Sequence, residues 1–222
     1  MAIASSNPTR ISSALERLQS SFPSAKIATY QCDLGGPDIE ARLIELFTAA
    51  TSSGNDLLDH IVYTAVPPFT LIPMEEQSVE DIQGAGRFHC IVPLLIGKVA
   101  PRFLHSGYKS SLTFTSGQIA EKPVKGWAVQ AAYGTACYGI AKALALDLAP
   151  TRVNCVSPGA TMTELWGPSL EEREKRAEVM KAAMLLGKVG SPDEVAECYV
   201  YLMRNWNATG SVVSSNGGSV LK

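Results

Sequence analysis

The sequence predicts an α/β fold in which a doubly wound, parallel β-sheet carries helices on both faces. Short runs rich in apolar and β-branched residues alternate with longer segments of helical periodicity. One strand–helix–strand unit occupies 110–163, where two such runs at 111–115 and 152–157 flank a helical run at 130–149. The length of 222 residues fits one domain over 1–222, with enough chain to bury a sizeable core.

The first part of the chain gives strand and helix signals in alternation. After a short strand at 1–4, the capping residue types Ser5, Ser6 and Asn7 precede Pro8, which suits the first turn of a helix. The elements expected in order are a strand at 1–4, a helix with apolar positions 11, 14, 15 and 18, a strand at 26–32, a helix at 39–50 and a strand at 59–65.

The second part of the chain continues this alternation on both sides of the central unit. Gly84 and Gly86 are expected to separate a short helix at 73–83 from a long helix at 88–105. The elements expected after the central unit are a charged amphipathic helix at 169–184, a helix at 192–205 capped by Ser191 and a strand at 210–215.

The carboxyl ends of the strands form the expected ligand edge of the sheet. Ser116 directly follows the strand at 111–115, and Pro158 with Gly159 stops the next strand. A serine in this place could hydrogen-bond a substrate carbonyl or orient a general base. The alternative is a serine whose hydroxyl only satisfies its own turn.

Composition and charge exclude few classes of protein, and they do not favour a charged partner such as nucleic acid or an acidic membrane. The net charge of −2 gives no support to a nucleic-acid or acidic-membrane partner. Five scattered cysteines without a C-x-x-C pair indicate free thiols rather than disulfides or a metal site. The longest apolar run, 90–99, is too short to span a membrane, and no signal peptide is evident, so a cytoplasmic protein is expected.

Several motifs together resemble the short-chain dehydrogenase/reductase family over about 2–221. They are Asp33 in CDL, the TSG at 115–117, the run LALDLAPTRVNCVSPGATMT at 144–163, GSPDEVAECYVYLM and TGSVVSSNGG. The resemblance implies a Rossmann-like fold, an NADP cofactor, a small-molecule substrate and a homo-oligomer, either dimer or tetramer. Gly126-Trp127 and the SSNPxR start resemble a branch that is common in fungal secondary metabolism.

The resemblance also implies positions for the cofactor. Asp33 would lie beside the adenine, while Ser5, Ser6 and Arg10 could hold a 2′-phosphate, because a helix start with an arginine suits phosphate. As an alternative, these last three are only a helix cap and a surface arginine. The remaining cofactor-contacting positions implied by the family's turns are Thr64, Ala65, Pro158, Gly159 and Thr163.

The amino-terminal part departs from the family pattern. The family opens with a strand, a glycine-rich turn and a helix that holds the cofactor diphosphate, and this chain shows no such segment. We therefore expect the first strand and helix of the sheet to be missing. Their place would be closed over, filled by another element or filled by a partner chain. The alternative is a start upstream of Met1.

The catalytic pattern of the family, formed by Asn, Ser, Tyr and Lys, is also changed. The spacing Tyr-x-x-x-Lys occurs at Tyr138 and Lys142, but register counting places the family's tyrosine and lysine near Gln130 and Gly134. We therefore expect the Tyr138 ring in the core and Lys142 in solvent. The candidates that remain for catalysis are Ser116, Tyr133 and His89.

Three functions stay open from the sequence. The first is an NADP-type oxidoreductase acting on a carbonyl or alcohol of a secondary metabolite, in which Ser116 polarises the oxygen and Tyr133 supplies a proton. The second is an isomerase, dehydratase or cyclase that works without a cofactor and uses His89, Ser116 and Tyr133 in the vacated cleft. The third is a pseudoenzyme that pairs with a full-length relative.

Overall fold

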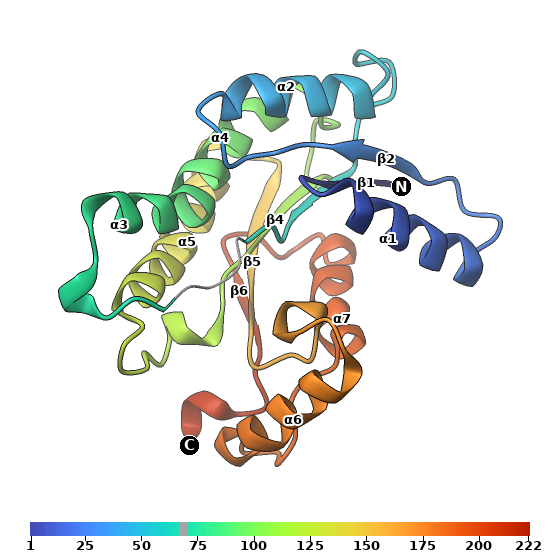
Figure 1. Cartoon of the computed structure of the whole chain (residues 1–222). Coiled ribbons are helices and arrows are strands. Elements are labelled where there is room, and N and C mark those ends of the chain that lie inside the picture. The colour runs from blue at the N-terminus through green and yellow to red at the C-terminus, as the bar shows by residue number, and fades with distance from the viewer. Residues whose placement is uncertain (67–70) are drawn as a thin grey trace.

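The computed structural model describes residues 1–66 and 71–222, which form an α/β structure with parallel sheets (Figure 1). One sheet pairs β1 (Ala2–Ser5) with β2 (Ala28–Gln31). The other sheet has the order β3-β4-β5-β6, with the strands β3 (His60–Tyr63), β4 (Ser111–Thr115), β5 (Arg152–Pro158) and β6 (Val212–Ser215). All pairings are parallel, as the sequence predicts.

The two sheets are separate in the described part of the chain, because no strand there pairs with both β1 and β3. β3 is therefore an edge strand, and its Val62 side chain is 37% exposed. The expectation that a first strand and helix are missing between these edges stays a prediction.

Helices cover both sides of the strands, as expected. Figure 1 shows α2, α3, α4 and α5 on one side, α1 and α7 on the other, and α6 beyond the carboxyl ends of β5 and β6. The bounds are α1 Pro8–Ser21, α2 Ile39–Ala50, α3 Val79–Gly86, α4 Val92–Val99, α5 Ala128–Asp147, α6 Leu170–Met180 and α7 Pro192–Arg204.

The main core lies between the four-stranded sheet and the helices α2, α4 and α5. Leu112 and Phe114 of β4 have no exposed surface, and they belong to the same buried apolar cluster as Ile39 of α2. Burying one such side chain stabilises the fold by roughly 1.5–3 kcal/mol. This packing holds the carboxyl ends of β3, β4 and β5 in a fixed register.

The helix starts follow the capping residues of the sequence. Asn7, and neither Ser5 nor Ser6, caps α1 by accepting a hydrogen bond from the Arg10 backbone N–H at 3.1 Å. Ser169 and Ser191 form capping boxes that start α6 and α7. Asn7 and Ser191 therefore confirm the caps predicted from the sequence, and Ser169 caps the helix that was predicted to begin there.

The segment between α3 and α4 differs from the prediction. Gly84 lies inside α3 and Gly86 is its last residue, but the helical backbone continues through Gly86 into a π-helical turn, Arg87–Ile91, that joins α3 to α4. The predicted helix at 88–105 is thus divided into this turn, α4 and a 3-10 turn at Ala100–Arg102. The reason lies in packing: a Cβ on Gly86 would stand 2.6 Å from Cζ of Tyr133 on α5, so the glycine permits close helix contact.

A buried arginine joins the amino end of β5 to the end of α7. Arg152 is 2% exposed, and its guanidinium donates to the carbonyls of Leu202 at 2.5 Å, Met203 at 2.9 Å and Asn205 at 3.1 Å. It also donates to the carbonyl of Tyr108 at 2.6 Å. These carbonyls include the last ones of the helix, which have no partner within it, so the arginine acts as a carboxyl-terminal cap.

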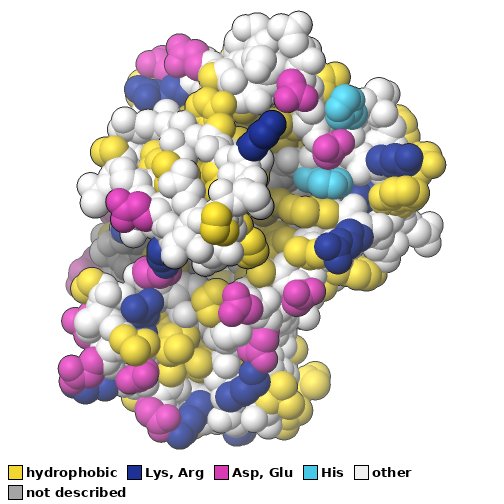
Figure 2. Space-filling model, turned by 90° about the vertical axis from the view of Figure 1, so that its right-hand side faces the viewer, with side chains coloured by type: hydrophobic (Ala, Val, Ile, Leu, Met, Phe, Trp, Pro, Cys, Tyr) yellow, Lys and Arg dark blue, Asp and Glu magenta, His cyan; other side chains and the backbone are white. Residues whose placement is uncertain are grey.

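The surface carries charges of both signs. Figure 2 shows Lys and Arg side chains interspersed with Asp and Glu side chains over the face that it presents. This face therefore offers no continuous basic stripe of the kind that binds nucleic acid. None of the helices in the described ranges is long and apolar enough to cross a membrane.

Candidate functional site

The carboxyl ends of β4, β5 and β6 come together in one polar edge. The Ser116 backbone N–H donates to the carbonyl of Val156 at 2.9 Å, and the Gly159 N–H donates to the carbonyl of Ser215 at 2.8 Å. Ser116, Pro158 and Gly159 therefore lie on the same edge, as the sequence predicts. In a doubly wound sheet this is the place where ligands bind.

Gly159 allows two loops of this edge to approach closely. A Cβ at this position would lie 2.6 Å from Cα of Asn216 and 2.9 Å from Oε1 of Gln118. Gln118 in turn is hydrogen-bonded to the hydroxyl of Ser219. A larger residue than glycine would force the loops after β4, β5 and β6 apart.

Ser116 is held by the helix that crosses the edge. Its hydroxyl donates to the carbonyl of Gly134 at 2.8 Å, and a Cβ on Gly134 would lie 3.3 Å from that hydroxyl. Gly134 is the position where register counting places the family's lysine. Ser116 is half-buried and its hydroxyl has a defined direction, but the hydroxyl proton is donated to the Gly134 carbonyl.

Tyr133 and His89 belong to two helices that pack together at this end of the structure. Tyr133 on α5 packs its ring against Gly86, directly before the π-helical turn that contains His89. The Nδ1 atom of His89 lies 3.3 Å from the carbonyl of Ala85, and burial lowers the pKa of this histidine. His89 is therefore favoured in its neutral form, and π-helical turns of this kind often occur at functional sites.

The structure brings together a cluster that the sequence did not indicate. Glu121, in the loop after β4, accepts hydrogen bonds through Oε1 from the hydroxyls of Tyr138 at 3.1 Å, Ser157 at 3.0 Å and Ser214 at 2.8 Å. The Tyr138 and Ser157 hydroxyls are also 2.6 Å apart. We call these four residues the Glu121 cluster. No spacing motif joins them, because they come from a loop, α5, β5 and β6.

Tyr138 thus lies partly where we expected and partly not. The Tyr138 ring packs against the core, and Lys142 is exposed. The Tyr138 hydroxyl, however, reaches the polar edge, where it lies 3.5 Å from the carbonyl of Gly117. Burial, together with the negative charge of Glu121, raises the pKa of Tyr138 to about 12. The phenol therefore stays protonated near neutral pH and acts as a hydrogen-bond donor.

The candidate cofactor residues occupy the carboxyl ends of the other strands. Ser5 accepts a hydrogen bond from the Asn7 N–H at 3.3 Å, and Arg10 is exposed, with no side-chain partner in the described part of the chain. The Asp33 carboxylate accepts a hydrogen bond from the Gly35 N–H at 2.9 Å. An exposed guanidinium and an exposed carboxylate therefore lie beyond the carboxyl ends of β1 and β2. The remaining candidates are the exposed residues Ser6, Thr64 and Ala65, and Thr163, which precedes a 3-10 turn at Glu164–Trp166.

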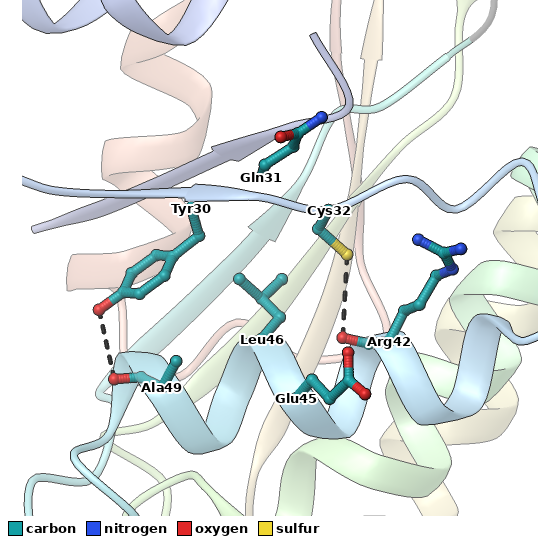
Figure 3. A pocket seen from close by; sticks show the side chains of 7 residues that line it. All are labelled: Tyr30, Gln31, Cys32, Arg42, Glu45, Leu46 and Ala49. Atoms are coloured by element: carbon teal, nitrogen blue, oxygen red, sulfur yellow. Dashed lines mark hydrogen bonds between the residues drawn. The ribbon is translucent and has the colours of Figure 1, made fainter. Parts of the chain in front are cut away.

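A pocket of about 240 Å³ lies away from this edge, between β2 and α2 (Figure 3). Tyr30 donates to the carbonyl of Ala49 at 3.3 Å on one side, and the Cys32 thiol lies 3.9 Å from the carbonyl of Arg42 on the other. Burial raises the pKa of Cys32, so the thiol is not activated. The pocket contains none of the candidate catalytic residues.

No group of three or more His, Cys, Asp or Glu side chains within the described ranges is arranged to hold a metal ion. The candidate groups described at the edge are hydroxyls, the Glu121 carboxylate and His89. Such groups can bind and orient a polar substrate and can move protons.

Comparisons with known proteins agree over the whole chain. The family model described as "SDR-like rossmann domain" matches residues 1–222. The short-chain dehydrogenase/reductase ATR9 from Stachybotrys chlorohalonatus is 44% identical over 222 residues, which cover 100% of this chain and 87% of that protein.

Two solved structures have the same fold. The structure of the MalC reductase/Diels-Alderase from Malbranchea aurantiaca has a TM-score of 0.90 and 33% sequence identity, covering 100% of this chain and 86% of that one. A small-chain dehydrogenase in complex with NADPH has a TM-score of 0.78 and 25% identity, covering 100% of this chain and 98% of that chain.

Proposed function

The chain belongs to the short-chain dehydrogenase/reductase family, and we propose that it is an NADP(H)-dependent oxidoreductase that acts on a carbonyl or alcohol of a secondary metabolite. The observation that carries this proposal is the shared carboxyl edge of Ser116, Pro158 and Gly159 in a chain that matches the family throughout. Relatives of the same fold bind NADPH, and ATR9 and MalC come from fungi.

The proposed cofactor would lie across the carboxyl ends of both sheets. Arg10, Ser5 and Ser6 would hold the 2′-phosphate, since the Arg10 guanidinium has no competing partner within the described ranges. Asp33 would contact the adenine. The other proposed contacts are Thr64 and Ala65 after β3, and Pro158, Gly159 and Thr163 on the nicotinamide side. When bound, the cofactor supplies a hydride or accepts one.

The proposed chemistry of the chain itself concerns the substrate oxygen. The Ser116 hydroxyl can turn from the Gly134 carbonyl to donate to that oxygen, at the cost of one internal hydrogen bond. Tyr133 supplies the proton in the reduction and takes one back from solvent afterwards, with neutral His89 as the relay that passes this proton on. The Tyr133 ring packs against Gly86, and this contact keeps the phenol hydroxyl near the π-helical turn.

The proposal is tested with NADPH that carries deuterium at the transferable position. Deuterium in the alcohol product, found by mass spectrometry with a panel of ketones, supports hydride transfer. We expect Ser116→Ala and Tyr133→Phe each to lower kcat/KM by about 10²–10³-fold. Tyr108→Phe, at the opposite end of β4, is the matched control and should change nothing. Product without deuterium, or full activity in both site variants, contradicts the proposal.

A second candidate is a cyclisation without net redox change. It is favoured by one comparison, because the related MalC protein is described as both a reductase and a Diels-Alderase. Turnover of a polyene substrate by the chain in the absence of any nicotinamide would support it. A strict requirement for NADPH would exclude it.

We also propose that the chain forms a homo-oligomer through α4 and α5. Apolar residues on these helices are exposed, with Leu94 of α4 at 48% and Leu146 of α5 at 82%, and Ile91, directly before α4, is 48% exposed. Native mass spectrometry should give a dimer or tetramer of this chain. A stable complex only with a longer relative would instead support the pseudoenzyme that pairs with such a relative.

A further inference from the structure

The Glu121 cluster holds one carboxylate in a fixed orientation at the carboxyl edge. Three hydroxyls donate to the same oxygen, Oε1, at 2.8–3.1 Å. Two of the donors, Ser157 and Ser214, sit on neighbouring strands in direct register. Because Ser157 is fully buried and the Tyr138 ring is packed, the carboxylate is oriented by rigid elements rather than by its own loop.

The other carboxylate oxygen, Oε2, is available. No hydrogen bond to it is formed within the described part of the chain, and Glu121 itself is exposed. None of the ion pairs among the described residues includes Glu121. The neighbouring cation, Lys122, is directed elsewhere, with its ammonium 3.3 Å from the carbonyl of Ser219. The negative charge therefore has hydroxyl partners but no cationic partner among the described residues.

The position of this charge relates it to the proposed substrate cleft. Tyr138, whose hydroxyl bonds Glu121, also approaches the carbonyl of Gly117, the residue after Ser116. Ser157 is directly before Pro158 at the end of β5. A ligand bound beside Ser116 would thus meet an oriented, unpaired carboxylate, whose attraction for a cation is stronger than that of a mobile surface glutamate.

We propose that Glu121 is a substrate anchor that selects carbonyl compounds carrying a protonated amine. Oε2 accepts a charge-assisted hydrogen bond from the ammonium N–H, while the carbonyl group lies toward Ser116. The proposal rests on the proposed oxidoreductase function for the carbonyl half of the substrate. The amine half follows from the Glu121 cluster itself.

The test compares two aldehydes of the same shape, para-(dimethylaminomethyl)benzaldehyde and para-isobutylbenzaldehyde. The first is cationic near neutral pH and the second is neutral. Their dissociation constants are measured by calorimetric titration of the full chain at low salt, both alone and with NADP⁺, which cannot reduce an aldehyde. We expect the amine to bind about 5- to 10-fold more tightly. Added salt should reduce this preference.

Three variants assign the preference to the cluster. Glu121→Gln keeps an oxygen for the three hydroxyls but removes the charge, so the preference should fall to about 1. Ser214→Ala removes one donor and should give an intermediate preference, because the carboxylate is less well fixed. Glu197→Gln removes an exposed carboxylate of α7 and should leave the wild-type preference, which controls for net charge.

Equal affinity of the wild-type chain for both aldehydes, or no measurable binding of either, overturns the proposal. Retention of the preference in Glu121→Gln also overturns it. Failure of the oxidoreductase proposal is seen separately, as absence of NADP⁺ binding. In that case the titration without NADP⁺ still tests whether the chain prefers the amine.

Discussion

At the level of single residues, Tyr138 shows what a spacing motif can and cannot indicate. Register counting placed its ring in the core and Lys142 in solvent, and the structure shows both positions. The contact of the Tyr138 hydroxyl with Glu121 could not be foreseen, because it belongs to a cluster whose member Ser214 is 93 residues from Glu121 in the chain. Such a contact depends on the order of the strands, which a local pattern does not contain.

Arg152 is a residue for which the structure predicts a large effect on stability. Replacing it by methionine leaves the carbonyls at the end of α7 without their donor, and hydrogen bonds to a charged group are each worth about 1.5–3 kcal/mol. We expect Arg152→Met to lower the free energy of unfolding by about 3 kcal/mol or more. Urea unfolding measures this change.

The matched control is Arg204→Met, in the last turn of the same helix. Its side chain is exposed, so the change should stay within about 0.5 kcal/mol. A loss in Arg152→Met no larger than that of the control would refute the role of the buried guanidinium as a cap.

At the level of elements, the helix pair α3 and α5 explains where the prediction was wrong. Glycines usually mark helix ends, but Gly86 has helical angles, with φ −66° and ψ −25°, and serves as a contact surface for Tyr133. The strands, by contrast, follow the sequence closely: the run predicted at 111–115 is β4, residue for residue. Runs of buried β-branched residues identify strands well, whereas a helix contact depends on a residue far away.

Two glycines of α3 give a sharp test of this contact. A methyl group on Gly86 would overlap the Tyr133 ring, so Gly86→Ala should destabilise the fold by about 1–3 kcal/mol and displace the proposed proton donor. At Gly84 no atom lies within 4 Å of such a methyl group. Gly84→Ala should therefore stabilise the helix by about 0.5–1 kcal/mol.

Thermal unfolding and turnover are measured for both glycine variants. The expected pattern is a lower Tm with slower turnover for Gly86→Ala, and an equal or higher Tm with normal turnover for Gly84→Ala. If both variants behave alike, the close packing of Tyr133 on Gly86 does not occur in solution.

At the level of the whole molecule, the parallel sheets and the helices on both sides could be predicted because period-2 and period-3.6 patterns alternate along the chain. The family could be predicted because its late motifs are contiguous in sequence. The site could be predicted only in part. Ser116 and Gly159 directly follow β4 and β5, and Pro158 is the last residue of β5, while the Glu121 cluster is assembled from four separate elements.

The arrangement of two sheets also bears on the cofactor. The proposed adenine and phosphate contacts lie on the β1–β2 sheet, and the proposed nicotinamide contacts lie on the other sheet. A dinucleotide would therefore bridge the two sheets and should stabilise them together. We propose that NADP(H) binds in this way.

The most direct test is a thermal-shift titration of the chain with NADP⁺ and NADPH, beside NAD⁺ and NADH. A ligand present at 100 times its dissociation constant adds about 2.7 kcal/mol of stability, which for a chain of this size raises Tm by several degrees. We expect a dose-dependent rise in Tm with NADP(H) that is smaller with NAD(H) and is reduced in Arg10→Ala. A folded protein whose Tm does not change with any dinucleotide would contradict hydride transfer by this chain.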